Sequence, residues 1–361
     1  GEDLTEEIPM YQWQTLEEDG WAELPGQTDQ VLVLENLTEA SVGSVYRCRI
    51  SLGELEVYSQ TAAITGLDPG EESDGWGTVT FINPLYKDVL TEEDLPQISP
   101  VETYAEEEEF TRYASQEEAS EAMKQALLRR EASFSAEFQL NGSSVPVPAS
   151  FMRPIYYGAV AHTGMPTEGD YLRYEFGGYR GTYSWDDRTY IFRCTYNFLY
   201  YTTADQEQEL NGEVQRILSQ LDLGEKTPKE KTDAIYDYLC THVVYDNKNL
   251  NNTAYTLKYT AYAALMKGTA VCQGYATAFY RLCLESGVDT REVTSEEMNH
   301  AWNIVNLGRF YYCVDATWDA NHQGNYLYYL KGRDYWLKNH KAQNVSVMGD
   351  AFDDPAFAER Y

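Results

Sequence analysis

The stretch Gly268-Thr-Ala-Val-Cys-Gln-Gly-Tyr-Ala-Thr-Ala-Phe279 decides how this chain is interpreted. Its second half continues as a helical pattern to Glu285, and Gly287 follows as a typical C-terminal capping residue. Cys272 therefore lies at the N-terminus of a predicted helix, where unpaired backbone N–H groups and the helix dipole favour a thiolate. A lone cysteine is more often a buried structural residue, so a catalytic interpretation needs a second observation.

That observation comes from the segment after the helix. The sequence pattern there predicts two strands, at 299–305 and 310–315, joined by a tight turn at 306–309. If Leu307 and Gly308 form a two-residue hairpin loop, the numbers of facing residues sum to 615, which places His300 opposite Asp315. A carboxylate there can accept one imidazole N–H and leave the other ring nitrogen for Cys272.

Three motifs in this order, VCQGYA, NHAWN and YCVDATWD, resemble the cysteine, histidine and aspartate motifs of the transglutaminase-like superfamily in its bacterial secreted branch. The resemblance runs from about residue 227 to 336. It implies a papain-like α+β core in which a helix carrying the cysteine packs on an antiparallel sheet. It also implies that Cys272 is the nucleophile, His300 the general base and acid, and Asp315 its orienting partner.

The sequence leaves the oxyanion donor open. Met266 stands six residues before Cys272, where papain-type enzymes keep a glutamine. The backbone N–H of Cys272 is one expected donor. Three side chains are candidates for the second donor: Gln273, Tyr245 and Tyr236. Trp302 and Trp318 are candidates for the wall of the substrate cleft, with core packing or a strand end as the alternative.

The remaining polar residues suggest no metal and no cofactor. The ligand set of the turn at Asp319, Asn321 and His322 is incomplete for calcium or zinc. Three histidines have no partner visible in the sequence and are interpreted as structural: His162, His242 and His340. Three cysteines are interpreted as core residues: Cys240, Cys283 and Cys313.

Composition excludes several classes of protein. The 361 residues carry a net charge of −31, of which −25 falls on residues 1–121 and −6 on the rest. This acidity disfavours nucleic acid and anionic lipid as partners. No apolar run approaches the roughly 18 residues of a membrane-spanning helix, so no membrane insertion is expected. The six cysteines form no CxxC pair, so a zinc ribbon or thioredoxin motif is unsupported.

We predict a multidomain chain. Residues 1–66 read as an all-β module, because alternation is clean at 45–50 and turn residues separate short strands. Trp13, Tyr46 and Cys48 resemble the immunoglobulin-like sandwich of bacterial surface proteins, without the partner cysteine, and another small β module stays open. Residues 67–112 follow as a linker and extended acidic segment, 113–205 as an α+β middle region, and 206–361 as the α+β papain-like catalytic domain.

The predicted function is that of a cysteine-nucleophile enzyme acting on amide or peptide bonds through an acyl-enzyme. Hydrolysis is favoured over transamidation, because water is the default acceptor. The expected substrate is a protein or peptide, cell-wall peptides included, and the expected location is secreted or cell-surface, with a signal peptide already removed. The alternative is a cell-surface binding or scaffold protein whose triad is idle. The sequence does not indicate whether the protein is a monomer or an oligomer.

Overall fold

The computed structural model divides into two units, Gly1–Asp74 and Gly75–Tyr361, and each is described by itself. The structure describes residues 10–17, 20–28, 32, 34, 41, 43–52, 55–59, 61–64, 76–83, 90–97, 110–140, 147–186, 188–295, 298–320, 322, 324–340 and 345–346.

The described strands of the N-terminal unit form one antiparallel sheet in the order β2-β1-β3-β4, with β5 also paired to β3. The strands are β1 (Met10–Glu17), β2 (Gly20–Glu23), β3 (Val45–Leu52), β4 (Leu55–Tyr58) and β5 (Ala62–Ala63). Trp13 and the buried Cys48 are direct neighbours across β1 and β3. The immunoglobulin-like sandwich is not confirmed, because the described strands supply only this sheet. Residues 31–37, which read VLVLENL and are also typical of a short strand, lie mostly outside the described residues, and the first part of the predicted linker, 67–75, lies wholly outside them.

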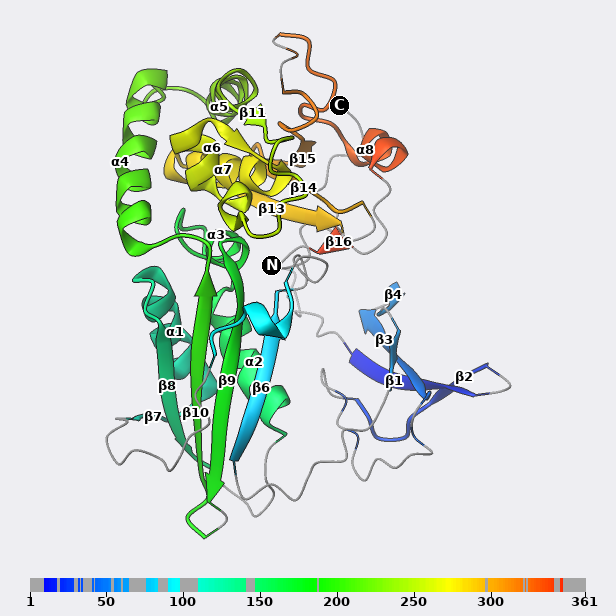
Figure 1. Cartoon of the computed structure of the whole chain (residues 1–361). Coiled ribbons are helices and arrows are strands. Elements are labelled where there is room, and N and C mark those ends of the chain that lie inside the picture. Colours follow the sequence, from blue (N-terminus) through cyan, green and yellow to red (C-terminus); the bar gives the residue numbers. More distant parts are fainter. Residues whose placement is uncertain are drawn as a thin grey trace, which may run out of the picture. The chain divides into compact units, whose positions relative to one another are not determined.

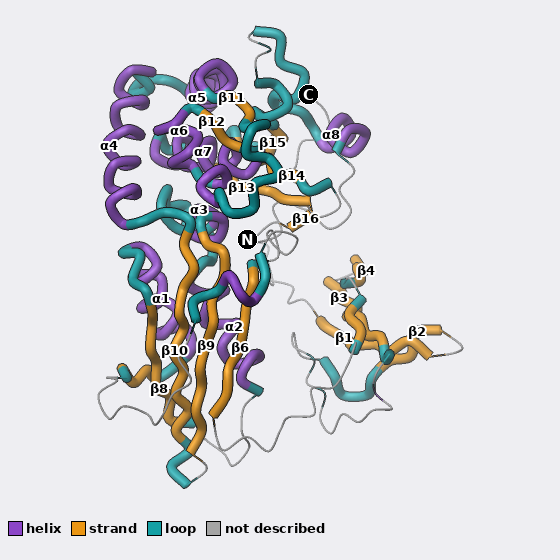
Figure 2. Tube along the Cα trace, in the orientation of Figure 1, coloured by secondary structure: helices purple, strands orange, loops and turns teal. Residues whose placement is uncertain are grey.

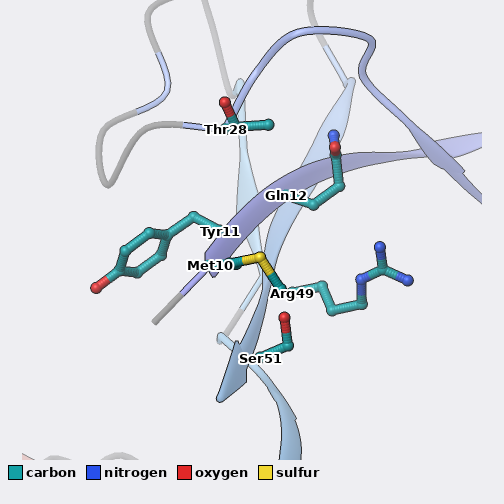
Figure 3. A pocket seen from close by; sticks show the side chains of 6 residues that line it. All are labelled: Met10, Tyr11, Gln12, Thr28, Arg49 and Ser51. Atoms are coloured by element: carbon teal, nitrogen blue, oxygen red, sulfur yellow. The ribbon is translucent and has the colours of Figure 1, made fainter. Parts of the chain in front are cut away.

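The N-terminal unit has an open pocket of about 450 Å³, shown in Figure 3. It is lined by Met10, Tyr11, Gln12, Thr28, Arg49 and Ser51. The cation of this set, Arg49, forms an ion pair with Glu23 at 2.6 Å. The lining includes no cysteine, histidine or carboxylate, so the pocket does not compete with Cys272 as a candidate for nucleophilic chemistry.

The second unit begins with a five-stranded sheet in the order β6-β9-β10-β8-β7 (Figure 1). Its strands are β6 (Trp76–Ile82), β7 (Thr111–Tyr113), β8 (Ser133–Gln139), β9 (Phe176–Asp186) and β10 (Ile191–Tyr200). A short 3-10 helix, η3 (Glu92–Asp94), lies between β6 and β7 in the chain. Helices α1 (Gln116–Leu128) and α2 (Pro148–Ala159) pack on the sheet and share its aromatic-rich core (Figure 2).

Several element predictions differ from this arrangement. Within the segment 67–112, predicted as linker and extended chain, the short run 78–82 has a β pattern and does form most of β6, whereas β7 at the end of the segment was not predicted. The Tyr-rich pattern of residues 171–183 predicts a strand, but β9 begins only at Phe176, because Asp170–Tyr174 forms the short helix α3. The pattern of residues 256–266 predicts one helix, but the structure has two, the 3-10 helix η4 (Thr256–Tyr259) and α6 (Ala261–Lys267), since the Thr260 side chain caps α6.

The rest of the unit places helices around α7 and a small sheet beside it. The helices are α4 (Ala204–Leu221), α5 (Pro228–His242), α7 (Cys272–Glu285) and α8 (Arg333–Asn339). The sheet has the order β15-β14-β13-β16, from β13 (Thr290–Ser295), β14 (His300–Asn306), β15 (Tyr311–Val314) and β16 (Val345–Ser346). From Gln273 to Leu284 every residue of α7 is buried, so this helix is the centre of the domain core. Among the described residues, no helix combines the length and hydropathy needed to cross a membrane.

Buried carboxylates join the five-stranded sheet region to the helical domain. Asp170 on α3 forms a two-pronged ion pair with Arg291 on β13, at 2.8 and 3.0 Å, and also accepts the backbone N–H of Glu292. Glu175, just after α3, accepts the N–H of Ala261 at the start of α6. These contacts make residues 113–205 a structural support of the helical domain.

Candidate active site

Cys272 is the first residue of α7. A short parallel pair, β11 (Val244–Tyr245) with β12 (Thr269–Ala270), fixes the chain just before it. Val271 takes extended backbone angles as the N-cap, and the first hydrogen bond of the helix runs from the Tyr275 N–H to the Val271 carbonyl. The backbone N–H groups of the first turn therefore have no acceptor inside the helix. Cys272 is half-buried, whereas the other five cysteines are buried.

Gly274 in the same motif is required by close packing. A Cβ at this position would lie 2.7 Å from the Ala270 Cβ and 2.8 Å from the Thr260 carbonyl oxygen. The first turn of α7 can therefore approach the segment before α6 only with glycine here. This explains in steric terms why the motif reads Cys-Gln-Gly.

His300 and Asp315 are hydrogen-bonded at 2.7 Å, from His300 Nε2 to Asp315 Oδ2. The register that predicted this pair is wrong. Facing residues of β14 and β15 sum to 617, because the hairpin loop is Gly308-Arg309 and Gly308 takes a φ of +102°. Extended by one residue, this register puts Asp315 opposite Trp302, so His300 is its diagonal neighbour on the same face. The predicted and observed pairings differ by two residues, so His300 and Asp315 stay on the same face of the sheet. Diagonal neighbours on one face are close enough for these two side chains to meet.

The charges of this pair stabilise each other. Burial alone would lower the pKa of His300, but the charge of Asp315 and hydrogen bonds with Asp315 and Cys272 outweigh it and raise that pKa to about 10. Burial alone would raise the pKa of Asp315, but the charge of His300 and hydrogen bonds from His300 and His340 lower it to about 2. Since His300 Nε2 is bound to Asp315, Nδ1 is the nitrogen left for the Cys272 thiol. The arrangement supports a thiolate–imidazolium pair held by a carboxylate.

The four acceptor positions of the Asp315 carboxylate are all used. Oδ1 accepts the backbone N–H groups of Thr317 at 2.9 Å and Trp318 at 3.1 Å. Oδ2 accepts from His300 and, at 3.1 Å, from His340 Nε2. The sequence interpretation of His340 as a structural residue without a visible partner missed this contact. No sequence signal could reveal it, because residue 340 lies 25 positions beyond Asp315, after a further helix.

The three oxyanion candidates lie in different places. The buried Tyr236 hydroxyl is hydrogen-bonded to the Asp315 backbone carbonyl and the Asp319 carboxylate, both at 2.7 Å. It therefore supports the backbone of Asp315. The Gln273 side chain is buried against Glu292 and Thr277, inside the domain. These contacts do not fit a side-chain oxyanion role for either residue. Tyr245 is half-buried, and burial together with the nearby Cys272 raises the pKa of its hydroxyl, which keeps it a neutral donor.

The two tryptophans predicted to line the substrate cleft also lie in different places. Trp302 is 1% exposed and belongs to the core beneath the sheet. Trp318 is half-buried and its ring stacks on His300, with centroids 5.1 Å apart and planes 20° apart. The structure adds Tyr259, whose pKa is raised by burial and by Cys272, as another aromatic neighbour of the thiol. Trp318 thus contacts His300 directly, whereas Tyr245 and Tyr259 lie within electrostatic range of the Cys272 thiol.

The residues given structural roles lie in the following places. Burial raises the pKa of the Cys240 and Cys283 thiols, and Cys313 is fully buried. The Asp319 carboxylate accepts the N–H groups of Leu327 and Tyr328, and Asn321 lies outside the described residues. His162 contacts Tyr280, and His242 stacks on Tyr238.

Three potential ligand atoms do converge in the described part of the chain. One atom each of His300, Asp315 and His340 lies within 4.8 Å of the others. Direct hydrogen bonds between the imidazoles and the carboxylate account for this geometry.

Comparison with known proteins agrees with the motifs. Residues 215–318 match the Transglutaminase-like superfamily. This stretch is a transglutaminase-like domain. It contains Cys272, His300 and Asp315, and it begins inside α4.

Curated relatives of the transglutaminase-like domain cover only a small part of each chain. Kyphoscoliosis peptidase of Mus musculus is 31% identical over 106 residues, which are 25% of this chain and 16% of that protein. The Homo sapiens protein of the same name is 30% identical over 109 residues, or 26% and 16%. The chain thus spans about a sixth of the length of these relatives.

Two solved structures also match. One, described as a TGase, has a TM-score of 0.27 and 13% identity, and covers 54% of this chain and 57% of its own. The other, a "Putative Cysteine Protease" from Cytophaga hutchinsonii, has a TM-score of 0.25 and 16% identity, and covers 38% and 56%. At these scores the two structures carry no argument, and the family assignment rests on residues 215–318.

Proposed function

We propose that this protein is a cysteine-nucleophile enzyme that cleaves amide or peptide bonds through an acyl-enzyme, with water as the usual acceptor. The observation that carries the proposal is the half-buried Cys272 at the N-terminus of a helix, facing a His300 whose Nε2 is bound to Asp315. In the sequence of events, His300 Nδ1 takes the thiol proton and the Cys272 sulfur attacks the substrate carbonyl carbon.

The later steps use the same groups. The oxyanion receives hydrogen bonds from the first-turn N–H of Cys272, with the neutral Tyr245 hydroxyl as our candidate for the second donor. His300 returns its proton to the leaving amine as the C–N bond breaks, which leaves a thioester on Cys272. A water then loses a proton to His300 and adds to the thioester carbonyl, and the carboxylic acid product departs with the thiol regenerated.

Aromatic side chains support a protein or peptide substrate. Trp318 stacks on His300, and Tyr245 and Tyr259 interact electrostatically with Cys272, so we propose that these three rings form part of the substrate cleft. We propose a secreted or cell-surface location, where proteins and cell-wall peptides are the accessible amides. This location rests on the sequence resemblance and can be tested by fractionating cells that carry the tagged full-length gene product.

The test of the reaction compares the full chain with Cys272→Ala. Each protein is incubated with a peptide library and with cell-wall peptides in H₂¹⁸O, with and without a primary amine, and products are read by mass spectrometry. Hydrolysis predicts cleaved products that carry ¹⁸O and need Cys272. Amine-linked products that exceed hydrolysis would replace the proposal by transamidation. Cys272 that reacts no faster with a thiol probe than an ordinary cysteine, with no product formed, would favour the scaffold alternative.

A further inference from the structure

His340 follows directly after α8 and is fully buried. Its Nε2 lies 3.1 Å from Asp315 Oδ2, the same oxygen that accepts the hydrogen bond of His300 Nε2 at 2.7 Å. The carboxylate of the triad is therefore shared between two histidines, of which only His300 has Cys272 as a neighbour.

The ring of His340 is held in place by aromatic side chains. Trp336 stacks on it with centroids 3.7 Å apart and planes 16° apart, and Trp318 lies 4.1 Å away on centroids. Trp302 meets it edge-on at 5.1 Å. Because Trp318 and Trp302 also contact His300, one aromatic cluster fixes both imidazoles.

The surroundings of His340 set its protonation. Burial lowers its pKa, and the opposing influence of Asp315 does not overcome this, so the ring is neutral at ordinary pH. Asp315 accepts and cannot donate while ionised, so the proton of the neutral ring is on Nε2. Among the described residues no hydrogen-bond partner reaches His340 Nδ1, which agrees with an unprotonated Nδ1.

We propose that His340 is a positioning residue of the triad: a fixed, neutral N–H donor that holds the Asp315 carboxylate so that Oδ2 stays aimed at His300. The inference rests on the proposed function, since it assigns a task within that chemistry. With Thr317 and Trp318 bound to Oδ1, the contact from His340 removes the last freedom of the carboxylate to turn. His300 is then confined to the tautomer that leaves Nδ1 for Cys272.

Two substitutions separate donation from packing. His340→Gln keeps an N–H near the position of Nε2 but loses the ring, whereas His340→Phe keeps a ring in the aromatic cluster but has no donor. We expect His340→Phe to slow alkylation of Cys272 at pH 6 roughly tenfold, and His340→Gln to stay within about threefold of the wild type. A role in packing alone predicts the reverse order. Equal loss in both variants, or a faster His340→Phe, would overturn the proposal.

A second readout needs no turnover. In the full-length wild type labelled with ¹⁵N-histidine, His340 should appear as the neutral Nε2–H tautomer at pH 7 and above, because burial lowers its pKa from the ordinary 6.5. A charged ring or an Nδ1–H tautomer would refute the inference even if the enzyme is active. Failure of the proposed function has a different signature: wild-type Cys272 would show no selective alkylation, whatever the tautomer of His340.

Discussion

Replacing Asp315 by asparagine should disable Cys272 through a change of tautomer. The carboxylate accepts from four donors: the backbone N–H groups of Thr317 and Trp318 on one oxygen, and both histidines on the other. An asparagine has one oxygen and one NH₂ group. With its oxygen kept on the two backbone donors, the NH₂ faces both Nε2 atoms, so each imidazole must move its proton to Nδ1. His300 Nδ1 then cannot take the proton of Cys272.

The magnitude follows from the charge that is lost. The step of the His300 pKa from 6.5 to about 10 corresponds to about 5 kcal/mol in favour of the imidazolium. His300 is 8% exposed, so water screens little of this. The loss of rate is limited by the thiolate that an unassisted cysteine still forms. An ordinary cysteine with a pKa of about 8.5 is only about 0.3% thiolate at pH 6. We therefore expect alkylation at pH 6 to slow by about 300-fold.

The assay is the rate at which iodoacetamide alkylates Cys272, read by mass spectrometry between pH 5.5 and 9. The variant rate should gain about tenfold per pH unit below about pH 8, as a free thiol does, so its deficit against the wild type should be largest at the acidic end and shrink as the pH rises. Asp289→Asn is the matched control, because Asp289 is also a carboxylate with a histidine neighbour, His162 at 3.8 Å, but lies away from Cys272. Equal rates for wild type and Asp315→Asn at pH 6 would refute the reasoning, provided that thermal melting shows both proteins folded.

Four further outcomes are expected. Gly274→Ala should cost about 1–3 kcal/mol in urea unfolding, because its Cβ meets the Thr260 carbonyl at 2.8 Å; an unchanged midpoint would contradict this packing. Asp170→Asn should cost about 3–5 kcal/mol by the same measurement, because Arg291 stays buried without its counterion, and a loss below about 1 kcal/mol would show that water reaches the pair. The raised pKa of His300 stabilises the fold fully below pH 6.5, so the melting temperature should fall as pH rises from 6.5 through about 10; a rise would reverse the assigned sign. A chain starting at Gly75 should fold and keep the alkylation rate of Cys272, and an insoluble or unreactive product would give residues 1–74 a part in the chemistry.

Local patterns predicted the elements that carry the site. The start of α7 at Cys272 and the glycine after its end both follow from neighbouring residues, which is the range at which capping and periodicity act. The contact between His300 and Asp315 was also predicted, although from a wrong loop. The predicted contact is still present because side chains of a strand alternate between the two faces of the sheet. An error of two positions therefore keeps both side chains on one face.

Contacts between distant segments could not be predicted in this way. His340 joins Asp315 only because the chain returns through α8, and Asp170 finds Arg291 across 121 positions. β6 joins a sheet whose next strand, β9, begins nearly a hundred residues later. Each of these depends on how separate elements pack, and neither periodicity nor spacing in one sequence contains that information. The roles of Gln273 and Tyr236 were uncertain for the same reason.

The ion pair between Asp170 and Arg291 bears on how this domain can be inherited. The family match begins at residue 215, yet a buried arginine inside it takes its counterion from residue 170. If residues 215–318 alone were recombined into another gene, Arg291 and the Glu292 N–H would lose their acceptor in the interior of the new protein. A segment that could be moved with this ion pair intact therefore includes Asp170 on α3, and a shorter one would need another acceptor for Arg291 or another residue in its place.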